Sequence, residues 1–190
     1  MGGIPSEIKG VKYRNDLTND IIYELENEAF KCHSQGGNEK YFSRDRKLTL
    51  NRLIISIMSF KSAIQRELDR FFKSISGDDF NIREVTKGAL SQARAKLNPD
   101  SFKRLNTVAV NTFYSKVDYN KWHGMRLLAV DGSTLVLPNH KSIIEEFGQH
   151  SFGPKADSKR SMATVSMLYD VLNLLTIDHE IAPYDTGERE

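Results

Sequence analysis

The chain has 190 residues, of which 39% are hydrophobic and 27% charged, and its formal net charge is +2. This is the composition of an ordinary soluble globular protein of one or two domains. The single cysteine, Cys32, excludes an intrachain disulfide framework and any metal site built from several cysteines. The N-terminal residues lack an apolar core of signal-peptide length, and no apolar run approaches the ~20 residues of a membrane span, so we expect a cytoplasmic protein.

A helix is the first predicted element, after a loose tail over residues 1–15. Apolar residues recur at every fourth position from Leu17 to Ala29, as on one face of an amphipathic helix. We expect this helix to end near Cys32, because residues 34–38 combine Ser, Gln, Gly and Asn in a typical loop.

Positive charge is concentrated in residues 40–104, where 15 Lys and Arg outnumber 7 Asp and Glu. A local surplus of this kind suits a polyanion such as nucleic acid, and a solvated helical surface is the alternative. Residues 41–49 mix aromatic with basic side chains, including Arg44, Arg46 and Lys47.

Two helices with apolar faces are predicted next. The first begins at Thr49 or Asn51, and its buried stripe consists of Leu50, Leu53, Ile54, Ile57 and Met58. The second has an apolar face made of Ile64, Leu68, Phe71 and Phe72. Residues 76–79 break the helical pattern.

A helix-turn-helix candidate follows these two helices. Thr86 is the expected N-cap of one helix, and Asn98 with Pro99 starts the next. Five basic residues decorate the pair, namely Lys87, Arg94, Lys96, Lys103 and Arg104. Contact with DNA is one interpretation of this pair, and two ordinary packed helices are the other.

At about residue 120 the helical periodicity stops and β-favouring runs begin. Residues 126–138 are apolar and read as a buried strand, with Asp131 in the middle. An unpaired charge costs several kcal/mol to bury, so Asp131 should face a cleft or hold a cation. The alternative is a carboxylate that caps a turn through the amides of Gly132 and Ser133.

The remaining residues predict a small antiparallel sheet. Residues 139–147 favour a short helix, and residues 148–160 a glycine-rich basic loop. Strands over 162–171 and 174–183 would complete a three-stranded meander, because short links join sequential strands. In the loop, Lys155, Lys159 and Arg160 are candidates for gripping phosphates, with a solvated basic loop as the alternative. From Thr186 the chain looks like the first turn of another helix.

Several short motifs follow one another along this half of the chain. They are Asp131-Gly132-Ser133, Phe147-Gly148, Leu168-Tyr169-Asp170-Val171, and Pro183-Tyr184 before Glu188-Arg189-Glu190. Together with residues 44–48 and 91–97, this combination and order resembles the insertion-sequence-four family of DDE transposases. The similarity runs from about Tyr41 to Glu190.

The resemblance implies an α+β fold with two parts. A helical N-terminal DNA-binding domain would occupy residues 1–120, and the first three strands of a ribonuclease-H-like catalytic domain would occupy residues 121–190. Asp131 matches the first of the family's three metal-binding carboxylates. The second carboxylate, an Asp on the fourth strand, and the third, a Glu on a late helix, are expected beyond Glu190.

The same resemblance implies a chemistry and a set of partners. In the complete domain two Mg²⁺ ions, about 4 Å apart, would support cleavage and strand transfer of DNA. One Asp cannot hold two such ions, so we expect this chain alone to be inactive. The expected partners are the double-stranded ends of a transposon and a second copy in a synaptic homodimer, in a nucleoid-associated location. The predicted DNA-binding residues are Arg44, Arg46, Lys47, Arg94, Lys96, Lys155, Lys159 and Arg160.

Two other functions are compatible with these residues. A truncated, non-catalytic product that occupies transposon ends would act as an inhibitor of transposition. A helical interaction domain without a role on DNA is the third possibility.

Overall fold

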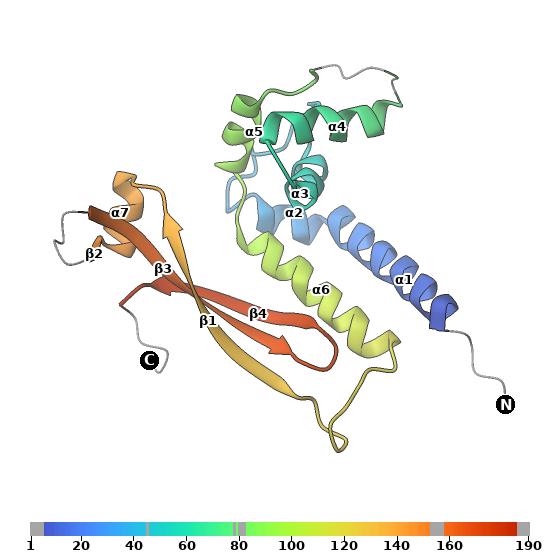
Figure 1. The fold of residues 1–190 in the computed structure, drawn as a ribbon. Coiled ribbons are helices and arrows are strands. Elements are labelled where there is room, and N and C mark those ends of the chain that lie inside the picture. The colour runs from blue at the N-terminus through green and yellow to red at the C-terminus, as the bar shows by residue number, and fades with distance from the viewer. Residues whose placement is uncertain (1–5, 45, 78, 80–82, 153–157, 186–190) are drawn as a thin grey trace. The chain divides into compact units, whose positions relative to one another are not determined.

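The computed structural model describes residues 6–44, 46–77, 79, 83–152 and 158–185. Its helices are α1 (Ser6–Glu26), α2 (Glu28–Ser34), α3 (Leu50–Ser59), α4 (Ile64–Ser76), α5 (Lys87–Arg94), α6 (Asp100–Lys116) and α7 (Lys141–Phe147) (Figure 1). Its strands are β1 (Leu128–Leu137), β2 (His150–Phe152), β3 (Ser158–Asp170) and β4 (Leu175–Pro183). The mixture of helices with an antiparallel sheet is the α+β class that the sequence predicts.

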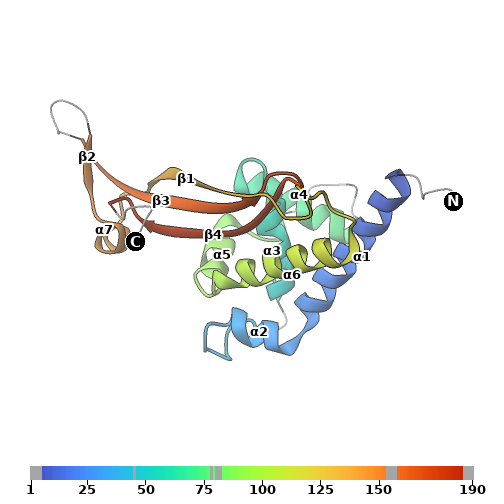
Figure 2. The ribbon, with the colours of Figure 1, turned by 90° about the horizontal axis from the view of Figure 1, so that it is seen from below.

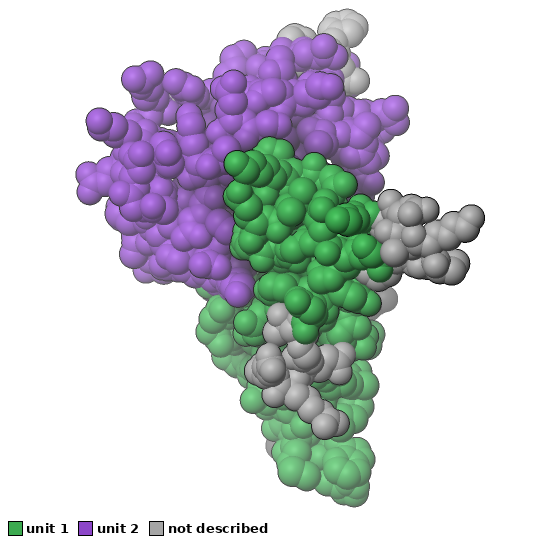
Figure 3. Space-filling model, turned by 90° about the vertical axis from the view of Figure 1, so that its left-hand side faces the viewer, with its two compact units in different colours: residues 1–17, 106–190 green, residues 18–105 purple. Residues whose placement is uncertain are grey.

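The chain divides into two compact units, coloured in Figure 3. Unit 1 contains Met1–Leu17 and Asn106–Glu190, and unit 2 contains Thr18–Leu105. These bounds differ from the predicted division at residue 120, because α6 contributes its first residues to unit 2 and the rest to unit 1. Among the described helices, none combines the length and the apolar character needed to cross a membrane.

Unit 2 is held together by two apolar clusters. The buried members of the first are Leu25, Phe30, Leu50, Ile54 and Leu105. The buried members of the second are Leu53, Leu68, Phe72, Val85 and Leu90. The predicted apolar stripe of α3 thus contributes residues to both clusters. Met58, in the last turn of α3, was predicted to belong to this stripe but is 59% exposed and lies outside the core.

The predicted helix starts in unit 2 are confirmed by their caps. The Thr49 side chain accepts a hydrogen bond from the Arg52 amide at 3.4 Å, and Thr86 accepts one from the Ala89 amide at 3.2 Å. Asn98 Oδ1 accepts the Asp100 amide at 3.1 Å, directly before α6. Each side chain satisfies an amide that has no partner within its own helix.

The N-terminal helix differs from its prediction at its start and in its interior. Residues 6–15 are helical and not a tail, because α1 begins at Ser6. Within unit 1, the Tyr13 ring packs edge-on against Phe113, with ring centroids 5.7 Å apart. The predicted single helix is also interrupted at Asn27, whose side chain accepts the Ala29 amide at 2.8 Å and thereby starts α2.

The sheet of unit 1 contains the predicted antiparallel meander. β1 pairs with β3, and β3 pairs with β4, both antiparallel (Figure 2). The predicted loop over 148–160 is wrong in part, because β2 and the first residues of β3 lie there and pair with each other. In an antiparallel pair of this kind, every second residue exchanges backbone hydrogen bonds with the residue opposite. The helix expected from Thr186 lies outside the described residues.

Candidate nucleic-acid interface

A pocket in unit 2 contains half of the predicted DNA-binding residues. Its volume is about 670 Å³, and its walls come from segment 40–48, residues 84–86, helix α5 and Lys96. Residue 45 within that segment lies outside the described residues. Helix α5 contributes Ala89, Gln92 and Ala93, whose short or neutral side chains leave the space open.

The charge on the walls is mostly positive. The basic residues among them are Lys40, Arg44, Arg46, Lys47 and Lys96. Glu84 is the acidic residue among the described ones that line the pocket, and it forms an ion pair with Lys47. Within the same described part, Arg44 and Arg46 make no ion pair and are exposed, so their guanidinium groups are available to an anion.

Aromatic side chains lie beside these charges. Lys96 Nζ stands 5.8 Å from the centroid of the Tyr41 ring, within the range of a cation–π contact. Phe42 has a φ of 56°, which an aromatic residue rarely adopts, and it packs against both apolar clusters of unit 2. Burial of Phe42 therefore compensates for the unfavourable backbone conformation and fixes the direction of the segment.

Hydrogen bonds to carbonyl groups hold the rest of the segment. Gln35 Nε2 donates to the Tyr41 carbonyl at 2.7 Å, and Ser43 Oγ donates to the Lys40 carbonyl at 2.9 Å. Arg52 Nη1 donates to the Lys47 carbonyl at 2.9 Å. The basic side chains thus extend from a backbone fixed at both ends, which reduces the entropy lost when a ligand binds.

The structure brings together four of the eight predicted DNA-binding residues, namely Arg44, Arg46, Lys47 and Lys96. Arg94 is exposed in the last turn of α5 but does not line the pocket. Lys159 and Arg160 belong to unit 1, where they are exposed on β3 opposite residues 150–151 of β2. Lys155 lies outside the described residues.

Two charged lining residues were not singled out from the sequence. Lys40 directly precedes the basic-aromatic segment, so extending the predicted segment by one residue would have included it. Glu84 is 37 residues from Lys47, and no local pattern connects the two. Arg104 has a structural role instead, because it pairs with Glu24 and stands 5.7 Å from the centroid of the Phe30 ring.

Asp131 lies in the middle of β1, opposite Met167 of β3. The turn alternative is wrong, because Gly132 and Ser133 continue the same strand. The prediction of a buried strand is also wrong, since nine of the ten residues of β1 are exposed. Within the described residues β1 has one neighbouring strand, β3, and its other edge has no strand partner there.

The described residues around Asp131 include no group of metal ligands. Its cross-strand row continues through Met167 to His179 of β4. In the part of the chain that the structure describes, no three His, Cys, Asp or Glu residues come together as metal ligands. A single carboxylate among the described residues does not hold a pair of Mg²⁺ ions, and the magnesium site stays a prediction.

An exposed position makes Asp131 tolerant of substitution. We expect Asp131→Asn to change the free energy of unfolding by less than about 0.5 kcal/mol, because the carboxylate leaves no buried partner behind. Urea unfolding followed by tryptophan fluorescence measures this change. A loss above about 2 kcal/mol would show that the carboxylate is tightly held, contrary to its exposed position.

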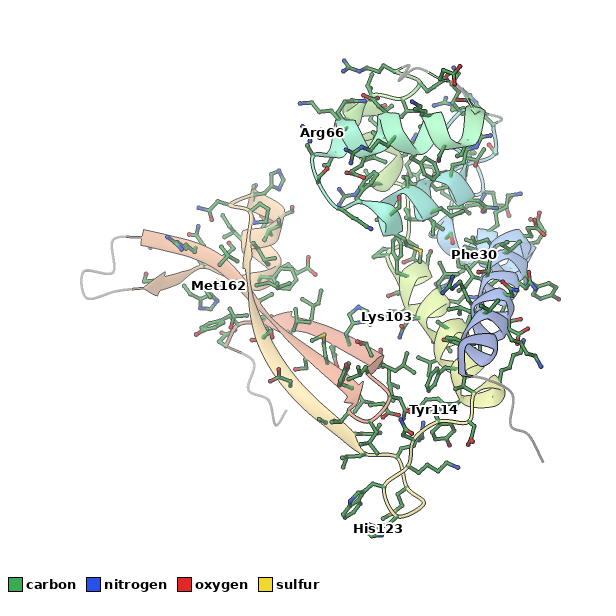
Figure 4. All side chains as sticks on the ribbon, turned by 45° about the vertical axis from the view of Figure 1, so that its right-hand side comes forward. Phe30, Arg66, Lys103, Tyr114, His123 and Met162 are labelled. Atoms are coloured by element: carbon green, nitrogen blue, oxygen red, sulfur yellow. The ribbon has the colours of Figure 1, made fainter. Side chains whose placement is uncertain are left out.

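Asp170 forms a separate polar centre at the end of β3. Its carboxylate is fully buried and accepts hydrogen bonds from Tyr114 Oη at 2.6 Å and Asn173 Nδ2 at 2.9 Å. Figure 4 labels Tyr114. The amides of Leu172 and Asn173 donate to the Asp170 carboxylate at 3.2 Å each. Burial alone would raise the pKa of this carboxyl, but the hydrogen bonds outweigh burial and hold the pKa below its ordinary value of 3.8. These contacts join α6 to the turn between β3 and β4, so Asp170 stabilises the fold of unit 1.

The two units therefore differ in the chemistry they present. Unit 2 carries a positive pocket with aromatic walls and a fixed backbone, which suits the phosphates of a nucleic acid. Unit 1 carries an exposed carboxylate on its first strand and a buried one that ties the sheet to α6. Comparison of the chain with protein-family models, with curated proteins and with solved structures finds no match.

Proposed function

We propose that this chain binds double-stranded DNA through the basic pocket of unit 2 and is the N-terminal part of a DDE-type transposase. The pocket carries the binding half of this proposal. Its two arginines without an ion pair among the described residues, Arg44 and Arg46, can each offer paired donors to phosphate oxygens. Contacts of this kind position a protein on a duplex without reading its sequence.

The meander supports the transposase half of the proposal. A ribonuclease-H-like domain requires three antiparallel strands with a carboxylate on the first, and β1, β3, β4 and Asp131 are compatible with that arrangement. The open edge of β1 is where a further strand would pair. Cleavage and strand transfer, with two Mg²⁺ ions, belong to the proposed complete domain and are not assigned to this chain.

Binding is tested by the anisotropy of a labelled duplex of random sequence, measured with the full chain at several salt concentrations. We expect the logarithm of the association constant to fall linearly with the logarithm of salt concentration, because each neutralised phosphate releases counterions. Absence of binding at about 50 mM salt would contradict the proposal and favour a helical interaction domain.

The transposase assignment has an independent test in the coding DNA. Translation beyond the codon for Glu190 should reveal a β-favouring run with an Asp and, later, a helix with a Glu. A stop codon at that place, together with salt-sensitive DNA binding, would favour the truncated inhibitor. An unrelated sequence would contradict the assignment.

A further inference from the structure

A short turn between α6 and β1 exposes the single tryptophan of the chain. Trp122 and Met125 exchange two backbone hydrogen bonds, of 2.8 and 2.9 Å, across His123 and Gly124. Both central residues have positive φ, 48° and 82°, as in the tight turns that close β-hairpins. Residues opposite each other in such a pair project to the same face, so the indole and the thioether lie side by side.

The base of this turn is fixed on both sides. The Asn120 amide donates to Asn173 Oδ1 at 2.8 Å, and Asn173 Nδ2 donates back to the Asn120 carbonyl at 3.0 Å. On the other side, the Val171 amide donates to the Leu127 carbonyl at 3.0 Å. All of these residues belong to unit 1, and Figure 4 shows His123 at the outer end of the loop. The aromatic tip is thus presented by an ordered support.

The two apolar side chains at the tip are both exposed. Trp122 is 54% exposed and Met125 is 59% exposed. The His123 ring meets the indole edge-on at a centroid distance of 4.6 Å, which leaves part of the indole accessible. Both side chains therefore present apolar surface that a partner could cover.

The charge around the tip indicates the kind of partner. Residues 119–130 contain Lys121 and Arg126, and the nearest acidic residues in the sequence are Asp118 and Asp131 at either end. Lys121 Nζ stands 4.7 Å from the Tyr119 ring, and the Arg126 guanidinium 4.8 Å from the Tyr114 ring. Aromatic faces interleaved with positive charge are the elements that bind single-stranded nucleic acid, where bases stack and phosphates are neutralised.

We propose that the Trp122 turn is a second nucleic-acid contact, which stacks an unpaired base on the indole while Lys121 neutralises the adjacent phosphate. This surface belongs to unit 1 and is distinct from the pocket of unit 2, so it goes beyond the proposed function. It favours a single-stranded segment over a closed duplex, because a paired base has no free face to offer.

The single tryptophan makes the test direct. Twelve-nucleotide oligothymidylate is added to the full chain while the fluorescence of Trp122 is followed, with and without acrylamide. We expect a saturable loss of fluorescence and protection from acrylamide. In anisotropy with labelled oligothymidylate, Trp122→Ala should raise Kd about tenfold, whereas Trp122→Phe should keep Kd within about threefold. Tyr23→Ala, at an aromatic residue of unit 2 that is 74% exposed, is the matched control and should leave Kd unchanged.

Three results would overturn the proposal. One is oligothymidylate binding that leaves the fluorescence of Trp122 unchanged. Another is quenching by phosphatidylserine vesicles but not by oligothymidylate, which would assign the tip to a lipid surface. The third is a change in Trp122 fluorescence with protein concentration alone, which would show that the tip contacts a second copy of the chain. Duplex binding by the pocket is measured separately, so either proposal can fail without the other.

Discussion

Alanine at position 170 is expected to lower the free energy of unfolding of unit 1 by about 3 kcal/mol. The substitution removes the acceptor for the Tyr114 hydroxyl, the Asn173 side chain and two backbone amides, all in a fully buried place. Each donor left without a partner retains its desolvation cost, so the loss exceeds that of one ordinary hydrogen bond. Urea unfolding followed by the fluorescence of Trp122 reports on this unit, to which the single tryptophan belongs.

Two variants make this measurement specific. Asp178→Ala removes an exposed carboxylate from β4 and is expected to change the free energy of unfolding by less than about 0.5 kcal/mol. Tyr114→Phe removes one donor and leaves the carboxylate in place, for an expected loss of about 1 kcal/mol. Equal stability of the Asp170→Ala and Asp178→Ala variants would contradict the role given to Asp170.

The same carboxylate predicts a dependence on pH. Hydrogen bonds hold the pKa of folded Asp170 below 3.8, so its ionised form is favoured by folding. The contribution of the Asp170 carboxylate to the free energy of unfolding should be complete above pH 3.8. It should be lost as the pH falls through the pKa of the folded state. The stability difference between the wild type and Asp170→Asn, measured from pH 7 downwards, should therefore shrink only in strong acid. A stability difference that grows as the pH falls would show that folding raises the pKa of Asp170 instead of lowering it.

Removing Arg44 and Arg46 together, by substitution with glutamine, is expected to weaken binding to a duplex about 100-fold. Both guanidinium groups are exposed in the pocket of unit 2, and each hydrogen bond to a charged phosphate contributes roughly a factor of ten. The slope of the salt dependence should also fall by about 2, one for each lost phosphate contact. Anisotropy titrations at several salt concentrations give both quantities.

A matched double variant separates local contacts from bulk charge. Lys61→Gln with Arg66→Gln removes the same charge from exposed residues of unit 2 that do not line the pocket. Arg66 lies on α4, where Figure 4 labels it. We expect this control to keep the affinity within about threefold of the wild type. If both double variants weaken binding equally, the affinity for DNA depends on the total charge of the chain, and the pocket is not the binding site.

The sequence predicted correctly those features that depend on residues close together in the chain. Thr49, Thr86 and Asn98 cap helices in this chain because their side chains reach amides two or three residues away. The apolar stripe through Leu53 and Ile54 is buried because a helix places residues of that spacing on one face. The pairing of β3 with β4 followed from the short link between two β-favouring runs. The pairing of β1 with β3 has no such local cause, because α7 and β2 lie between these strands in the sequence.

Contacts between distant residues required the tertiary structure. The ion pair between Glu84 and Lys47, and the bond from Tyr114 to Asp170 across 56 residues, depend on how the chain folds back. The exposure of β1 was misjudged for the same reason, because an apolar run shows its affinity for an interior but not whether neighbouring elements cover it. Local patterns thus predicted the capped helices, the meander of sequential strands and the surplus of positive charge. Which of those charges share a pocket depended on the fold, since burial and proximity result from long-range packing.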